Sequence, residues 1–88
     1  MQRWTNIFRV LANVNRLKIM QMLSQGQPIN VTNIARELKI SFKATSNHLA
    51  TLKNAEVVDS QGSSGHVFYT LNSKMQVDFR KALKLFLT

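Results

Sequence analysis

Apolar residues recur every three or four positions along much of the chain, and this spacing predicts helices. A first helix is expected over residues 2–12, and a second is expected to begin after a break at residues 13–15. The break contains two asparagines, which are favourable helix caps. The second helix should stop near Ser24, with Gly26 ending it and Pro28 just beyond.

The middle of the chain, residues 30–54, predicts two short helices joined by a tight turn. Asn30 is placed to cap the first, which ends near Leu38. Ser41 is placed to cap the second, which runs to about Asn54. A pair of this kind is a helix-turn-helix, and in proteins that bind DNA through it the second helix enters the major groove.

The pattern then changes from helix to strand. Two β-prone runs, residues 57–60 and 66–71, lie on either side of a flexible segment rich in glycine and serine, residues 61–65. We expect a β-hairpin, or wing, across residues 57–71.

A final helix is expected over residues 73–87, beginning at Asn72 or Ser73. The predicted order is helix, helix, helix, helix, strand, strand, helix. The 88 residues leave no room for a second core, so residues 1–88 should form a single domain. This order is that of a mainly α protein with a β-hairpin wing, a winged helix-turn-helix.

The charge of the chain is strongly positive and unevenly placed. Twelve Lys and Arg against four Asp and Glu give +8. Residues 1–55 hold eight basic residues and one acid, a net of +7, whereas residues 56–88 hold four basic and three acidic residues, a net of +1. We expect the first part to face a polyanion, and with a helix-turn-helix that polyanion is double-stranded DNA.

Several classes of function are disfavoured by what the chain lacks. Without cysteine there are no disulfides, thiolate metal sites or cysteine nucleophiles. No nucleophile–base pair, carboxylate pair or phosphate-binding loop can be assembled, so no enzyme is expected. No apolar run is long enough to cross a membrane and no signal-peptide pattern occurs, so we expect a cytoplasmic protein without a membrane partner.

The helix expected from Ser41 to Asn54 has two different faces. One should be buried and carries Thr45, Leu49 and Leu52 at spacings of four and three. The other carries Lys43, Ser46, Asn47, Ala50 and Asn54. No acidic residue occurs between Ser41 and Ala55, so nothing on this helix repels phosphate, and its N-terminus adds a partial positive charge.

Individual DNA contacts can be assigned to this helix. Asn47 can form two hydrogen bonds with adenine, and Lys43 can donate to guanine or to a phosphate. Ser46 can bond a base or a backbone oxygen. Phe42 either touches a thymine methyl group or folds back onto its own domain, and Lys53 suits a phosphate.

The tip of the hairpin offers a second contact, along the neighbouring minor groove or the sugar-phosphate edge. It lacks Lys and Arg, so its contribution should be weak, with Ser64 and His66 as the candidate residues and His66 donating to a phosphate. His48 falls between the two faces of the preceding helix. We expect it to be packed or hydrogen-bonded rather than to bind a ligand.

Motifs along nearly the whole chain resemble the ArsR/SmtB family of winged-helix repressors. They are FRVLANVNRLKI at residues 8–19, the apolar pattern of residues 31–38, ISFKATSNHLATLK at residues 40–53, and VFYTL at residues 67–71. The resemblance implies a repressor that binds a pseudo-palindromic operator as a homodimer.

Family dimers pair through the first and last helices, and the resemblance places that interface on apolar residues of both ends. These residues are Trp4, Ile7, Phe8, Leu11, Met75, Phe79, Leu83 and Phe86. An apolar stripe on each terminal helix agrees with pairing, because so small a monomer has difficulty covering both. The alternative is that both stripes pack within one chain.

The departures from the family concern its metal sites. Many members sense metals through a cysteine pair on the third helix, or through Asp and His on the last helix. The third helix here offers only Val31, Thr32, Asn33 and Ile34. The last helix has Asp78 but no histidine. We therefore expect no metal and no cofactor.

Two further departures affect the turn and the operator. Lys39 stands where the family prefers glycine, so it must adopt a left-handed backbone at a cost of roughly 1 kcal/mol, or the turn differs. Asn47 stands where the family has a histidine, so the operator sequence cannot be carried over from relatives.

Two other functions remain open. A winged helix can act as a protein-interaction module, although an acidic or apolar second helix would then be expected. It can also act as a non-specific architectural DNA binder, which would bind unrelated duplexes alike.

Overall fold

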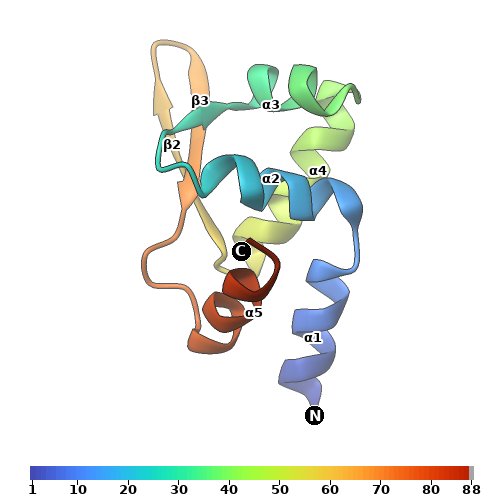
Figure 1. Ribbon diagram of the computed structural model, residues 1–88. Helices are drawn as coiled ribbons and strands as arrows, with labels where there is room; N and C mark the ends of the chain where they lie inside the picture. The colour runs from blue at the N-terminus through green and yellow to red at the C-terminus, as the bar shows by residue number, and fades with distance from the viewer. Residues whose placement is uncertain (88) are drawn as a thin grey trace.

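A computed structural model describes residues 1–87. Its elements in chain order are α1 (Gln2–Leu11), α2 (Val14–Leu23), β1 (Ile29–Asn30), α3 (Val31–Leu38), α4 (Phe42–Asn54), β2 (Val58–Ser63), β3 (His66–Leu71) and α5 (Val77–Leu87). The predicted helices and the predicted hairpin are all present, so the winged helix-turn-helix is confirmed. Figure 1 shows α2 across the middle of the molecule, α1 and α5 at one end, and the hairpin at one side.

Three helices begin at the caps that the sequence indicated. The side-chain oxygen of Asn13 accepts from the backbone N–H groups of Asn15 and Arg16. That of Asn30 accepts from Asn33 at 2.8 Å. Ser41 Oγ accepts from Ala44 at 3.0 Å, so α2, α3 and α4 each have one or two of their unpaired N–H groups satisfied.

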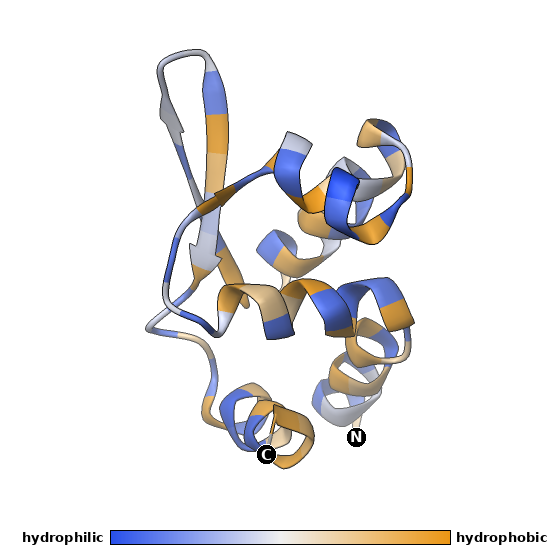
Figure 2. Cartoon of the chain, turned by 45° about the horizontal axis from the view of Figure 1, so that its top comes forward, coloured by the Kyte–Doolittle hydropathy of each residue, from blue (hydrophilic) through white to orange (hydrophobic). Residues whose placement is uncertain are grey.

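The wing has a tighter turn than the sequence predicted. Residues 61–63, assigned to a five-residue loop, continue β2, and Ser63 pairs with His66 across a two-residue turn. Ser64 and Gly65 both have positive φ, 53° and 79°, as a type I′ hairpin turn requires. The paired strands project beyond the helices (Figures 1 and 2), so the wing tip stands clear of the core.

A third strand was missed. β1 pairs antiparallel with β3, with Ile29 opposite Tyr69, and the sheet order is β1-β3-β2. Two residues that follow Pro28 are too few to show an alternating pattern, so this strand depends on the presence of β3 rather than on local sequence.

The last helix begins later than predicted, at Val77 rather than at residue 73. Residues 72–76 instead form a turn, in which Asn72 accepts from Met75 through its carbonyl and from Lys74 through its side chain. Asn72 therefore stabilises a turn and does not cap α5. Met75 precedes the helix but is buried all the same.

The core lies between α2, α3, α4 and the base of the wing. Its fully buried side chains are Ile7, Ile19, Met20, Ile34, Leu49, Leu52, Val57, Val58 and Thr45. Thr45 is the one polar member, and its hydroxyl donates to the Ser41 carbonyl at 2.9 Å. Figure 2 shows blue and orange residues alternating along the helices, as expected when one side of each is buried.

The apolar stripes of α1 and α5 are partly covered within the single chain. Ile7, Met75, Phe79 and Leu83 are buried, whereas Leu11 and Phe86 are half-buried. Trp4 and Phe8 remain 40% and 64% exposed. An ion pair of 2.8 Å between Arg3 and Asp78 joins the two helices. Of the eight residues proposed for a dimer interface, four thus already belong to the chain's own core.

Candidate DNA-binding interface

The helix α4 is anchored by the face that the sequence predicted. Thr45, Leu49 and Leu52 are all completely buried. On the opposite side Lys43, Asn47, Ala50 and Asn54 are exposed and Ser46 is half-buried. Three side chains therefore pack α4 into the core, while its polar side faces solvent.

The turn before α4 has the strained residue that was expected. Lys39 adopts the left-handed conformation, with φ 58° and ψ 41°. Its N–H donates to the Arg36 carbonyl, and the Ile40 N–H donates to the Ala35 carbonyl, so the last carbonyls of α3 are paired. A lysine in this conformation costs roughly 1 kcal/mol, and the conformation produces the abrupt change of direction between α3 and α4.

The wing tip and the start of α4 line the same groove. It has a volume of about 300 Å³ and is lined by Asn30, Val31, Thr32, Phe42, Gly65, His66 and Val67. Phe42 is 59% exposed, so its ring is not folded away into the core. Thr32 and Val67 were not among the predicted contacts. They lie here because β1 brings the start of α3 against β3, an arrangement that the sequence did not reveal.

The remaining predicted DNA contacts lie at different ends of the surface that α4 and the wing form. Ser64 and His66 are exposed at the wing tip, where the His66 ring meets Phe68 edge-on at 6.3 Å. Lys53 lies near the other end of α4, and its Nζ donates to Ser60 Oγ of β2 at 2.6 Å. Lys53 therefore connects α4 to the wing, and its ammonium keeps two further N–H donors that can meet a phosphate.

Arg16 is a positioning residue that sequence reasoning missed. Its Nε donates to the Val10 carbonyl at 2.7 Å and its Nη2 to the Arg9 carbonyl at 2.9 Å, both near the end of α1. Its Nη1 lies 3.3 Å from Nδ1 of His48 on α4. Arg16 thus joins α1, α2 and α4. Its contact with His48 spans 32 positions of sequence, so it left no local signal.

His48 is hydrogen-bonded rather than free, as predicted. Burial lowers the pKa of its ring below 6.5, and the nearby Arg16 charge lowers it further. Because arginine has only donors, Nδ1 accepts from it, and this requires a ring nitrogen without a proton.

Within the described residues, 1–87, no helix is long and apolar enough to cross a membrane. The same residues include no group of three or more His, Cys, Asp or Glu side chains close enough to hold a metal ion.

A helix-turn-helix followed by a two-stranded wing, with a recognition helix free of acids, defines a winged helix-turn-helix DNA-binding domain. Residues 13–60 match the model of the family described as bacterial regulatory protein, arsR family. The chain belongs to the ArsR family. It is therefore a DNA-binding transcriptional regulator, a class that is not enzymatic.

Named relatives agree with this assignment. The chain is 32% identical over 73 residues to the transcriptional repressor SdpR of Bacillus subtilis, covering 83% of this chain and 80% of SdpR. It is 35% identical over 69 residues to the cadmium resistance transcriptional regulatory protein CadC of Listeria innocua, covering 78% of this chain but 58% of CadC.

Solved structures share the fold. HlyU from Vibrio cholerae superposes with a TM-score of 0.81 at 27% identity, over 97% of this chain and 88% of HlyU. The homodimeric winged helix-turn-helix domain of Mb0332 from Mycobacterium bovis gives 0.79 at 24% identity, over 97% of this chain and 75% of the other.

Proposed function

We propose that the protein is a repressor that binds a pseudo-palindromic operator as a homodimer, with the exposed side of α4 in the major groove. The observation that carries this proposal is the acid-free polar side of α4, which stands beside the wing tip on one surface. SdpR, a relative over most of its length, is a transcriptional repressor. Such a protein would act on promoter DNA, in the cytoplasm.

The proposed DNA contacts are made by the exposed side of α4 and by the wing. Lys43, Ser46 and Asn47 read base edges or fix the backbone, because they lie within the first two turns of α4 and are not buried. Phe42 reaches a thymine methyl group or a sugar through its exposed ring. Ser64, His66 and Lys53 contact the sugar-phosphate backbone on either side of the major groove.

The dimer forms through the apolar residues that the monomer leaves uncovered at α1 and α5. Trp4 and Phe8 lie on one side of α1 with ring centroids 6.0 Å apart, and large aromatic rings of this exposure are typical of interfaces. Leu11 and Phe86 extend this surface. The Mycobacterium bovis domain with this fold is a homodimer.

Control by a metal at the usual family sites is not part of the proposal. CadC is named for cadmium resistance, but this chain has no cysteine, and its α5 carries no histidine to join Asp78. Zinc and softer metals bind through thiolate and imidazole ligand sets of that kind.

Selection of bound sequences from a random DNA pool tests the function. The proposal predicts a two-fold symmetric site whose half-sites are about one helical turn apart. Recovery of unrelated sequences would instead identify an architectural binder. Absence of any salt-dependent binding to duplex DNA would favour a protein-interaction module and would contradict the proposal.

A further inference from the structure

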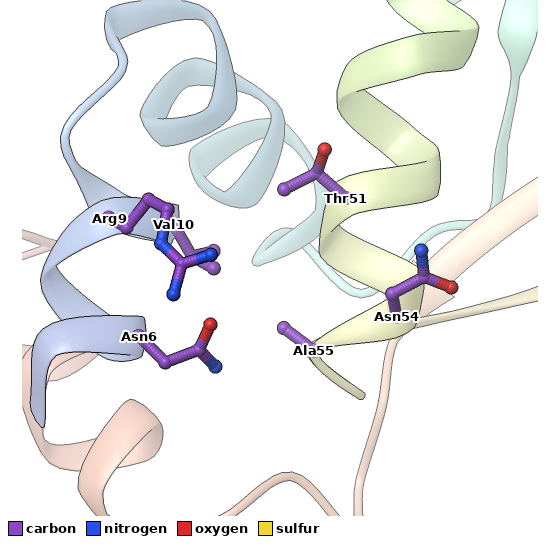
Figure 3. Close-up of a pocket in the computed structure, with 6 residues that line it drawn as sticks. All are labelled: Asn6, Arg9, Val10, Thr51, Asn54 and Ala55. Atoms are coloured by element: carbon purple, nitrogen blue, oxygen red, sulfur yellow. The ribbon is translucent and has the colours of Figure 1, made fainter. Parts of the chain in front are cut away.

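A second polar cleft lies away from the groove between α4 and the wing. It has a volume of about 240 Å³ and lies between α1 and the end of α4. Its lining residues are Asn6, Arg9, Val10, Thr51, Asn54 and Ala55. In Figure 3 the side chains of Asn6 and Arg9 extend from α1 towards Thr51 and Ala55, and Asn54 lies at the edge.

The polar groups of this cleft are not used by the fold. No hydrogen bond or ion pair joins the side chains of Asn6, Arg9 or Asn54 to another residue within the described range 1–87. They offer one guanidinium and two carboxamides. None of the lining residues is acidic, and Glu56, the next residue after Ala55, is exposed and does not line the cleft.

The backbone around the cleft is also free of uncompensated negative charge. Helix ends expose carbonyl oxygens that repel anions. Here the Thr51 and Lys53 carbonyls accept from the N–H groups of Ala55 and Glu56, and the Arg9 and Val10 carbonyls accept from Arg16. Among the side chains that line the cleft, the Arg9 guanidinium carries the charge.

The chemistry and the size define a ligand class. A guanidinium presents parallel N–H donors that match the two oxygens of a carboxylate. Val10 and Ala55 supply an apolar wall beside it. The volume is below that of sites for drug-sized molecules, so the ligand is small.

The position of the cleft gives it a route to DNA binding. Arg9 and Val10 lie on the stretch of α1 that Arg16 holds, and Arg16 also contacts His48 on α4. A ligand bound to Arg9 and packed against Thr51 would join α1 to α4 at a second point. It would thereby fix the angle between the helix with the exposed Trp4 and Phe8 and the helix in the major groove.

We propose that this cleft is an effector site for a small monocarboxylate with a short apolar body, and that its occupation changes operator affinity. The coupling to DNA rests on the proposed function, whereas the binding site itself does not.

Nuclear magnetic resonance on the full chain without DNA tests the site. Sodium propionate, butyrate and phenylacetate are titrated at constant ionic strength, with inorganic phosphate as the comparison anion. We expect saturable shifts for at least one carboxylate in the signals of the Asn6 and Asn54 side-chain amides, the Arg9 Nε–H and the Thr51 backbone. Phosphate should bind with an affinity at least about tenfold lower, because it lacks the apolar body.

Two variants make this test specific. Arg9→Gln should abolish the saturable shifts at Asn6 and Asn54. Arg36→Gln removes another exposed arginine, which lies on α3 outside the cleft, and should leave them unchanged. A folded Arg9→Gln protein, judged by its dispersed spectrum, that still binds the carboxylate would overturn the assignment.

Other outcomes also decide the question. Equal affinity for phosphate and carboxylates would overturn the carboxylate class. Shifts at these residues that follow protein concentration rather than ligand would show that a second copy of the chain covers the cleft, and would overturn the site.

Operator affinity is then measured with and without the carboxylate that binds. A change of at least about fivefold, lost in Arg9→Gln, supports the coupling. Saturable binding of the carboxylate without a change in operator affinity overturns the coupling, but the binding site itself then stands. Failure of the unliganded protein to bind DNA would contradict the proposed function instead, so the two failures are distinguishable.

Discussion

Arg16 and His48 are separated by 32 positions in the sequence, yet Nη1 of Arg16 lies 3.3 Å from Nδ1 of His48. The same guanidinium donates to two carbonyls near the end of α1. One side chain therefore sets the position of the recognition helix α4 against the helix that carries Trp4 and Phe8. This contact gives the first two predictions.

The stability of the protein should fall as the pH drops below about 6.5, in part because of His48. Its pKa is lower in the folded state than the ordinary value of 6.5, so the unfolded chain binds the proton first. The contribution of His48 is fully present above pH 6.5, declines below it, and levels off once the folded-state pKa is passed. Urea denaturation across this range measures the slope. His48→Gln should flatten it and His66→Gln should not. Equal slopes in all three proteins would show that His48 has no such role.

Loss of the Arg16 side chain should destabilise the fold. Arg16→Ala removes three hydrogen bonds from a charged donor and leaves two carbonyls of α1 unpaired, so we expect a loss of about 2 kcal/mol in the free energy of unfolding. Arg16→Lys should recover only part of this, because an ammonium cannot reach three acceptors in the same fork geometry. A loss below about 0.5 kcal/mol for Arg16→Ala would place it among ordinary surface residues.

Much of the fold could be predicted from local sequence. The caps Asn13, Asn30 and Ser41 and the buried face of α4 each depend on residues within a few positions of one another, and all of them were predicted correctly. The left-handed Lys39 is one of the two alternatives that the sequence left open for the turn.

The errors occur where long-range contacts decide the structure. β1 exists because β3 pairs with it, and the wing strands extend to Ser63 because His66 lies opposite. The Asn72 N–H donates to the Val57 carbonyl at 2.8 Å, which holds this residue at the base of the wing, and α5 begins only at Val77. Arg16 and the cleft at Arg9 could not be found from sequence, since neither spacing nor periodicity brings α1 to the end of α4.

Dimerisation should depend on the exposed aromatic residues of α1. Phe8→Ser removes a ring that is 64% exposed, so it should weaken self-association by at least about tenfold while changing monomer stability little. Sedimentation equilibrium measures the dissociation constant. Phe42→Ser is the matched control, because Phe42 is similarly exposed at 59% but lies beside the wing. If both variants dimerise as the parent does, α1 is not the interface.

The charge of Lys43 should appear in the salt dependence of DNA binding. If its ammonium contacts a phosphate, Lys43→Ala should reduce the slope of log K against log salt concentration by about 1 for each subunit. Lys81→Ala, which removes an exposed lysine of α5, should leave that slope unchanged. Fluorescence anisotropy with a labelled operator at several salt concentrations provides the measurement. An unchanged slope for Lys43→Ala would mean that this lysine reads a base or contacts nothing.

The central claim, that the exposed side of α4 reads DNA sequence, is tested most directly by random-pool selection with the parent protein and Asn47→Ala side by side. Asn47 is exposed, so its replacement should leave the fold intact. We predict a two-fold symmetric site for the parent. In the variant, discrimination worth about 1–3 kcal/mol should be lost at one position of each half-site, with the other positions unchanged. Identical preferences for the two proteins, or no preference in either, would contradict the claim.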